Sequence, residues 1–171
     1  MIRLIARLLL IFPMFSTGSL LNTRLLLHQV GHAMLSSAVT EAPVVVTRLT
    51  LNNESCDLQC VRLRPARMRD SLHAHLLVRL GGAAAEEVLC GREQMSEEGH
   101  HDRDRGLALA SRFGKGDESY QLAYSEAISL VNERAHDILE MAATLLRHEE
   151  IVFISSHSRH PISSAISEDV V

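Results

Sequence analysis

His28-Gln29-Val30-Gly31-His32 is the stretch that decides the fold, because it places two histidines four residues apart within an apolar segment. Apolar residues recur around it at helical spacing, at Leu20, Leu21, Leu25, Leu26, Val30, Ala33 and Met34. We therefore predict a helix over residues 22–39. Side chains four residues apart on a helix project from the same face, so His28 and His32 can bind one metal ion together. In a chain with ten histidines such a pair also arises by chance, which leaves a helical protein with an incidental pair as the alternative.

The residues that follow this helix predict a small β-hairpin. Thr40-Glu41-Ala42-Pro43 ends the helix, because the residue before a proline disfavours helical conformation. Residues 44–51 are rich in β-branched side chains, Asn52-Asn53 is a turn signal, and residues 60–63 form the returning strand. Extended polypeptide is expected to pair with residues 44–51 if that strand lies at the edge of its sheet.

Further helices are predicted in the second half of the chain. Residues 71–89 have one apolar face, formed by Leu72, Leu76, Leu77, Leu80, Ala84 and Val88. The pair Gly81-Gly82 inside this helix costs about 1 kcal/mol per residue relative to alanine, which predicts close approach of another backbone. A polar loop is predicted over residues 92–101, followed by helices over residues 102–113 and 125–150.

Composition indicates one domain without nucleic acid as a partner. A chain of 171 residues, 46% of them hydrophobic, can bury one core, and we place the domain at residues 21–152 with an α+β, mainly α, fold. The net charge of −4 shows no basic excess, so a nucleic-acid partner is not expected. Cys56, Cys60 and Cys90 contain no C-x-x-C pair, which argues against a disulfide framework or a zinc ribbon and favours a reducing compartment.

The two ends of the chain differ from this domain in composition. Residues 1–20 form an apolar segment, expected to be a helix that docks on the domain or anchors weakly to a membrane. Its stretch from Leu4 to Phe15 contains Arg7 and Pro13 and is shorter than the about 20 apolar residues that span a bilayer. No clear cleavage site marks it as a secretory signal. Residues 153–171 are Ser-rich, and we predict a disordered tail there.

Four stretches of the sequence occur in an order that carries further information. They are His28-Gln29-Val30-Gly31-His32-Ala33, Pro43 to Leu51, Leu80-Gly81-Gly82-Ala83-Ala84-Ala85-Glu86-Glu87-Val88, and Gly99 to Phe113. This series resembles the peptidase domain of the FtsH-type ATP-dependent zinc metalloproteases. That family has His-Glu-x-Gly-His-Ala, a first strand, a Leu-Gly-Gly-Arg-Ala-Ala-Glu-Glu helix, and a segment with an aspartate as third metal ligand. The resemblance covers about residues 25–150 and implies a helical zincin-type peptidase domain.

The resemblance also implies a zinc ion bound by His28, His32 and one aspartate. Asp102 and Asp104 are the candidates, and the register of the following residues favours Asp102. With Asp102 as ligand, the residues that match the family's types are Asp104, Arg105, Gly106, Leu109, Ala110 and Arg112.

The segment around Asp102 departs from the family's pattern in two ways. Arg103 stands where an apolar residue is usual, and His100-His101 stands where small polar residues are usual. Either of these histidines is therefore an alternative ligand. The competing interpretation is an exposed, charged turn in which Asp102 caps the start of a helix.

Gln29 is the most serious departure, because it occupies the position of the general base. Two imidazoles, one carboxylate and an open fourth position form a catalytic zinc site, which activates water and polarises the scissile carbonyl. A nearby carboxylate must then accept a proton, and the neutral amide of Gln29 cannot. The open explanations are a substitution made to trap substrate, a natural pseudopeptidase, and rescue by Glu86 or Glu87. We choose Glu87 as the carboxylate that orients a ligand histidine, with a solvated helix face as the alternative.

The predicted function is a zinc-dependent metalloendopeptidase domain that cleaves unfolded polypeptides and is weak or inactive with Gln29. The alternative is a non-catalytic pseudopeptidase that serves as a polypeptide-binding or regulatory module. The sequence contains no G-x-x-x-x-G-K-[ST] phosphate loop, so the expected partners are an ATPase or further copies of the chain. The expected location is the cytoplasm or the cytoplasmic face of a membrane, with an organelle stroma or matrix as the alternative.

Overall fold

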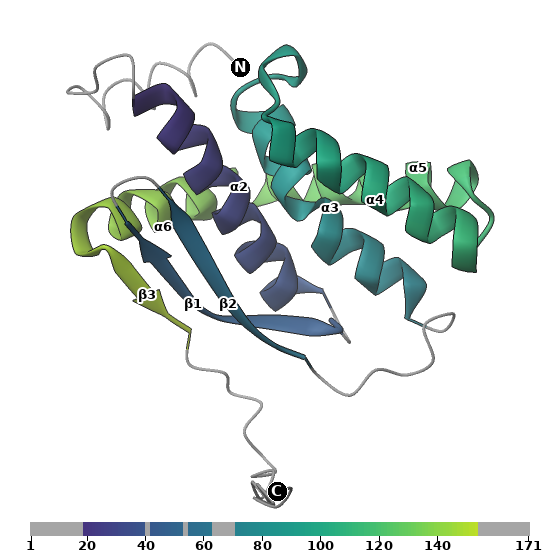
Figure 1. Cartoon of the computed structure of the whole chain (residues 1–171), viewed down its shortest axis with the longest axis horizontal. Coiled ribbons are helices and arrows are strands. Elements are labelled where there is room, and N and C mark those ends of the chain that lie inside the picture. Colours follow the sequence, from purple (N-terminus) through teal and green to yellow (C-terminus); the bar gives the residue numbers. More distant parts are fainter. Residues whose placement is uncertain (1–18, 40–41, 53–54, 63–70, 154–171) are drawn as a thin grey trace, which may run out of the picture.

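The helix that carries the histidine pair runs through the middle of the molecule. The computed structural model describes residues 19–39, 42–52, 55–62 and 71–153. Helix α2 (Ser19–Ala38) contacts a three-stranded sheet and α6 (Ala135–His148), and along another side it packs on α3 (Leu72–Leu89) (Figure 1). Helices surrounded in this way bury apolar side chains on several faces. The buried apolar side chains of α2 are Leu26, Leu27, Val30, Ala33, Met34 and Leu35.

The sheet contains the predicted hairpin and one strand that was not predicted. Its antiparallel strands are β1 (Val44–Leu51), β2 (Cys56–Arg62) and β3 (Glu150–Val152), in the order β2-β1-β3. The hairpin is confirmed, although its second strand begins at Cys56 instead of residue 60. Strand β1 pairs with β2 along most of its length and with β3 over residues 48–50, so the edge that polypeptide addition alongside residues 44–51 requires is not present at those three residues. Within the described residues, the outer edges belong to β2 and β3.

Strand β3 follows directly from the end of α6. Glu149 takes a left-handed conformation with φ of 59° and ends the helix, and its carbonyl accepts a hydrogen bond from the Leu51 N–H. Phe153 N–H donates to the Thr47 carbonyl, so the sheet contacts continue one residue into the segment predicted to be disordered. A strand of three residues is too short to show a period of two in the sequence, which explains why it was missed.

Helices α2 and α3 cross with their backbones in close contact. A Cβ added to Gly31 would lie 2.5 Å from the Gly81 carbonyl oxygen, and one added to Gly81 would lie 2.9 Å from the Gly31 oxygen. Any side chain at either position would force the helices apart. The predicted close approach of another backbone to Gly81 is therefore confirmed.

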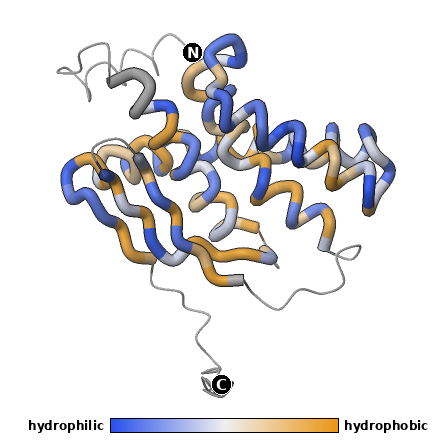
Figure 2. The backbone as a smooth tube through the Cα atoms, viewed as in Figure 1, coloured by the Kyte–Doolittle hydropathy of each residue, from blue (hydrophilic) through white to orange (hydrophobic). Residues whose placement is uncertain are grey.

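Helix α4 (Glu97–Phe113) begins inside the stretch predicted as a polar loop. The Ser96 side chain caps it by accepting a hydrogen bond from the Gly99 N–H, and a short 3-10 helix, η1 (Arg92–Gln94), precedes it. Hydrophilic residues dominate the first half of α4 (Figure 2), so the sequence there lacks the apolar residues at helical spacing that predict a helix. Asp102 therefore lies in the second turn of a helix and does not cap its start.

The long C-terminal helix predicted over residues 125–150 is two helices. Helix α5 (Asp117–Glu133) starts eight residues earlier than predicted and ends at Arg134, whose φ of −108° and ψ of 14° depart from helical values, and α6 follows. The α+β, mainly α, fold class is nevertheless confirmed. Most of the predicted N-terminal segment and C-terminal tail lies outside the described residues. No helix among the described residues has the length and hydropathy needed to cross a bilayer.

Candidate metal centre

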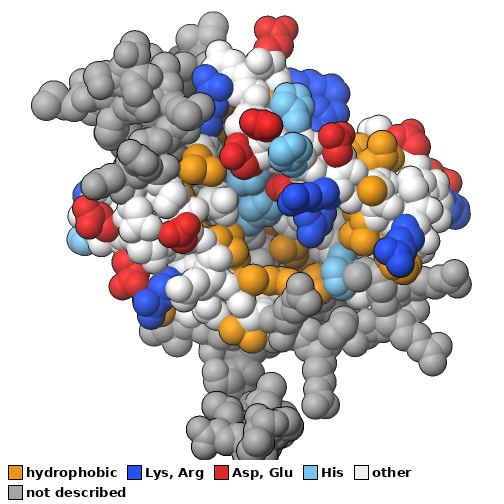
Figure 3. All heavy atoms as spheres, viewed as in Figure 1, with side chains coloured by type: hydrophobic (Ala, Val, Ile, Leu, Met, Phe, Trp, Pro, Cys, Tyr) orange, Lys and Arg blue, Asp and Glu red, His pale blue; other side chains and the backbone are white. Residues whose placement is uncertain are grey.

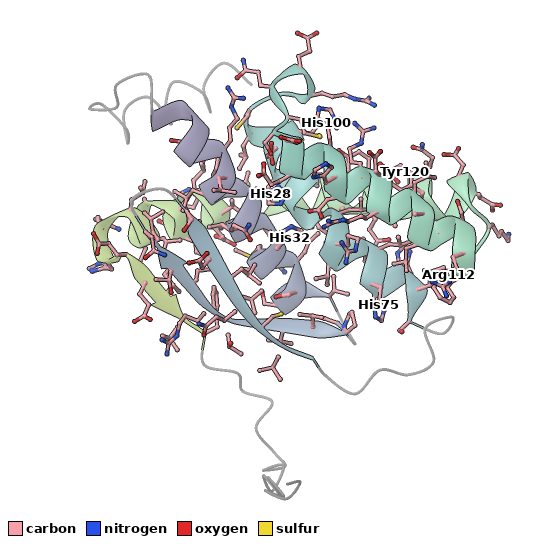
Figure 4. All side chains as sticks on the ribbon, in the orientation of Figure 1. His28, His32, His75, His100, Arg112 and Tyr120 are labelled. Atoms are coloured by element: carbon pink, nitrogen blue, oxygen red, sulfur yellow. The ribbon has the colours of Figure 1, made fainter. Side chains whose placement is uncertain are left out.

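Three side chains from two helices converge at one point. His28 and His32 project from α2, and Asp102 projects from α4. The Asp102 Oδ2 atom lies 2.8 Å from His32 Nε2 and 3.3 Å from His28 Nε2, and the two Nε2 atoms are 3.1 Å apart. The two histidines lie side by side on α2, and His100 of α4 lies apart from them (Figure 4).

These separations approach those of a tetrahedral metal site. Zinc bonds of 2.0–2.2 Å in a tetrahedron place neighbouring ligand atoms about 3.3–3.6 Å apart. The observed distances of 2.8, 3.1 and 3.3 Å lie at or below the lower end of this range, so binding of an ion would move the three atoms slightly apart. Three protein ligands with this chemistry would hold a tetrahedral ion and would leave its fourth position open.

Hydrogen bonds at the far side of each imidazole fix its tautomer. His28 Nδ1 lies 2.7 Å from Glu86 Oε1, and His32 Nδ1 lies 2.9 Å from the Val78 carbonyl oxygen. A carbonyl oxygen can only accept, and so can an ionised carboxylate, so each Nδ1 carries a proton that it donates. In the neutral rings both Nε2 atoms then point unprotonated lone pairs at the space beside Asp102. Two lone pairs and a carboxylate repel one another unless a cation lies between them.

Asp102 shows the same need for a cation. The residue is only 8% exposed, and its Oδ2 atom is the buried side-chain atom without a hydrogen-bond partner among the described residues. The nearby imidazole nitrogens lie 2.8 and 3.3 Å from it but do not form hydrogen bonds of normal geometry with it. A buried polar atom without a partner costs about 1–3 kcal/mol, and more if charged, so a bound metal ion would remove that cost.

In the metal-free protein, a proton on His28 compensates the two carboxylates. Burial lowers the pKa of His28, but Asp102 and Glu86 outweigh burial and raise this pKa to about 9. Burial raises the pKa of Asp102, but His28 and His32 outweigh burial and hold this pKa well below its usual range. A metal ion and a proton therefore compete for His28 Nε2.

Gly82 of α3 provides the space for both imidazoles. A Cβ added at this position would lie 2.6 Å from His28 Cε1 and from His32 Nε2. Real Cβ atoms do not approach other atoms so closely. The Gly81-Gly82 pair, which lowers the stability of the helix, therefore allows two close contacts. Gly81 packs against the backbone of α2, and Gly82 packs against the histidine rings.

Glu86, not Glu87, is the carboxylate that hydrogen-bonds a candidate ligand histidine, which corrects the choice made from the sequence. Glu86 is fully buried, and it accepts hydrogen bonds from His28 Nδ1 and from the N–H and hydroxyl of Ser96. Burial raises the pKa of Glu86, but the bonds from His28 and Ser96 outweigh burial and lower it. Because Ser96 caps α4, Glu86 links the ligand on α2 to the start of the helix that holds Asp102. Glu87 accepts a hydrogen bond from the Tyr124 hydroxyl at 2.7 Å.

Glu86→Gln is expected to weaken zinc binding by about 10- to 100-fold, because loss of an outer-shell carboxylate typically has this effect. The nearly isosteric amide removes the negative charge that strengthens the Nδ1–H bond of His28. Competition with a fluorescent zinc chelator measures the affinity. Glu87→Gln is the matched control, since it makes the same change one residue away and should leave zinc affinity nearly unchanged. Equal losses in the two variants would contradict the assignment to Glu86.

The other residues considered from the sequence lie outside this group. His100, His101 and Asp104 are exposed on α4, and among the described residues they do not join the three convergent ligands. Gln29 is partly exposed beside His28. Glu86 is fully buried and bonded to His28 and Ser96, and Glu87 bonds Tyr124, so neither carboxylate is free to take the role of the base.

Sequence reasoning missed three groups at this centre. They are the Val78 carbonyl, Ser96, and Arg79, whose Nη1 lies 3.8 Å from Asp102 Oδ1. A backbone acceptor has no sequence signal, but Ser96 does have one, since a serine before Glu97-Glu98 is typical of a helix N-terminus.

No protein-family model matches the sequence, and no curated protein matches it either. The resemblance to FtsH-type peptidases therefore stays a prediction from the sequence motifs of this chain.

Proposed function

We propose that this chain binds one zinc ion through His28, His32 and Asp102 in a metallopeptidase-type domain that recognises polypeptide. The observation that supports this proposal is the convergence of two imidazole Nε2 atoms and a buried, unpartnered carboxylate oxygen on one point. The ordered motifs that resemble the FtsH-type peptidase domain lead to the same conclusion independently of the distances.

Zinc is the metal that this set of ligands suits best. Imidazole favours zinc, copper, nickel and iron, whereas magnesium and calcium prefer oxygen ligands throughout. Two imidazoles, one carboxylate and an open position are the arrangement of a catalytic zinc site. A bound zinc ion would supply Lewis acidity there. His28, His32 and Asp102 would hold the ion, and Glu86 would stay shielded from water. Gln29 would follow His28 on the same helix.

Gln29 limits the activity of the proposed centre. Peptide hydrolysis requires a group that takes a proton from water and gives it to the leaving nitrogen, and an amide cannot do this. Loss of such a base reduces rates by about 10²–10⁴-fold. We therefore propose a latent metalloendopeptidase that binds polypeptide and hydrolyses it slowly. A non-catalytic polypeptide-binding or regulatory module is the second candidate, and Gln29 is the observation that favours it.

The proposed ligand is extended or unfolded polypeptide. The outer edge of β2 is the sheet edge for which we propose strand addition, since β1 is paired with β2 on one side and, over residues 48–50, with β3 on the other. An ATPase that unfolds substrates, or further copies of this chain, is the proposed partner. The proposed compartment is reducing, namely the cytoplasm, the cytoplasmic face of a membrane, or an organelle stroma or matrix.

The zinc content of the purified chain tests the proposal. Protein prepared without an affinity tag is expected to carry one zinc ion per chain by elemental analysis, and His32→Ala and Asp102→Asn are expected to carry almost none. His136→Ala is the matched control, because this histidine is exposed on α6 and far in sequence from the centre, and it should keep the metal. Zinc well below one ion per chain in the unaltered protein, after dialysis against zinc, would refute the proposal.

A further inference from the structure

Arg79 brings a cationic group to the edge of the metal centre. It lies on α3, and its Nη1 atom is 3.8 Å from Asp102 Oδ1, while the other oxygen of Asp102 faces the two histidines. Arg79 has a side chain 41% exposed, whereas the side chain of Asp102 is only 11% exposed. The guanidinium is therefore positioned between the buried carboxylate and solvent.

The donors of Arg79 are available to a ligand. A separation of 3.8 Å is too long for a hydrogen bond, so Asp102 attracts the guanidinium without occupying its N–H groups. Within the described part of the chain, no hydrogen bond engages these five donors. A guanidinium presents its donors as a planar fork that matches the two oxygens of a carboxylate.

The charges of the centre favour an anionic ligand. A divalent ion and Arg79 carry three positive charges, and the ionised side chains of Asp102 and Glu86 carry two negative charges. One positive charge remains, because Gln29 is neutral. A glutamate at that position would cancel this charge and would repel an anion at the open coordination site.

We propose that the metal and Arg79 together form a carboxylate subsite, which captures polypeptides by a C-terminal or acidic side-chain carboxylate. This inference rests on the proposed zinc centre and specifies its ligand. The two oxygens of Asp102 already face the candidate metal position and Arg79, since Oδ2 lies beside the histidines and Oδ1 lies nearest Arg79. A ligand carboxylate would bridge the same two groups from the solvent side.

The surface around the centre fits a peptide ligand. Histidine side chains reach this face, with basic and acidic side chains beside them and hydrophobic side chains next to them (Figure 3). Hydrophobic neighbours can contact the body of a peptide, while the metal and Arg79 bind its carboxylate. A small inorganic anion would leave these neighbours unused.

Fluorescence anisotropy with three labelled peptides tests the subsite in the full, zinc-loaded chain. The first is an N-terminally fluorescein-labelled nonapeptide of glycine, serine and alanine with a free C-terminal carboxylate. The second is the same peptide amidated at its C-terminus, and the third is the amidated peptide with a central glutamate. The free carboxylate is expected to strengthen binding by about tenfold or more, the effect of one charge-assisted hydrogen bond. Binding of the third peptide shows whether the carboxylate of a glutamate side chain also binds at this subsite.

Arg79→Gln is expected to remove the preference for the free carboxylate and to keep one zinc ion per chain. Arg79→Lys keeps the charge without the fork and should retain part of the preference. Arg105→Gln is the matched control on the exposed face of α4 and should behave like the unaltered protein. A preference that is absent from the unaltered protein, or that survives Arg79→Gln, overturns the inference. So does loss of zinc in Arg79→Gln, which would make Arg79 a support for Asp102 alone. Elemental analysis before peptide addition separates these results from failure of the zinc centre itself.

Discussion

Gln29→Glu is expected to raise the rate of peptide hydrolysis by about 10²–10⁴-fold, the usual contribution of a positioned general base. The residue directly follows His28 on α2 and is partly exposed, so a carboxylate there is not buried in the core. Glutamate is nearly isosteric with glutamine, and the substitution should leave the fold and the imidazole pair intact. It adds the proton acceptor that the remaining carboxylates cannot supply, because Glu86 and Glu87 already accept hydrogen bonds from His28 and Tyr124.

Cleavage of casein and of an internally quenched peptide, with and without a zinc chelator, measures this gain. Gln94→Glu is the matched control, since it adds the same charge on the exposed helix η1 and should leave the rate unchanged. Adding Asp102→Asn to Gln29→Glu should abolish the gain. If Gln29→Glu binds zinc and still cleaves no faster than the unaltered protein, the latent peptidase is wrong and the non-catalytic module remains.

The sequence predicted the elements that follow from local patterns. The helix around His28 and His32 has a clear apolar period, and β1 has a run of β-branched residues with a turn signal after it, so both were placed within a few residues. Asp102 was chosen over Asp104 from the register of the following residues. The structure places Asp102 beside the histidines and leaves Asp104 exposed. That choice succeeded because residues 102–112 are helical, and a helix fixes which of two aspartates shares a face with the buried Gly106 and Ala110.

The choice between Glu86 and Glu87 failed because it depends on how α3 is rotated about its axis, which the sequence does not define. Consecutive residues on a helix differ by about 100° in direction, so one of the pair faces α2 and the other faces α5. The sequence places both in α3 but does not define how far α3 is rotated about its axis against α2. The backbone contact between Gly31 and Gly81 defines that rotation, and it directs Glu86 toward His28. Rotation is a tertiary property that no local pattern encodes.

Gly82→Ala is expected to weaken zinc binding by more than about 100-fold, which exceeds the usual loss of one outer-shell hydrogen bond. The same rotation of α3 that brings Glu86 to His28 puts Gly82 directly against both rings. A methyl group there would lie 2.6 Å from His32 Nε2, which is a predicted ligand atom, and 2.7 Å from His28 Nδ1, which donates to Glu86. Neither ring can move away without losing its own Nδ1 hydrogen bond, to Glu86 or to the Val78 carbonyl. Zinc titration against a competing chelator measures the loss, and circular dichroism checks that the helices remain.

Gly106→Ala separates a local effect on the metal centre from general strain at the helix contacts. A Cβ at Gly106 would also be too close to a neighbour, 2.9 Å from Leu80 Cδ2, but that atom is the end of a flexible side chain. The variant should therefore lose some thermal stability and keep its zinc affinity, whereas Gly82→Ala should lose affinity whatever its stability. Alanine is the better helix former by about 1 kcal/mol, so this contribution stabilises both variants and opposes the destabilisation that the close contacts cause. If Gly82→Ala retained full zinc affinity, the two histidines would have to bind the ion from positions other than those in the structure, and the geometry on which the zinc assignment depends would be wrong.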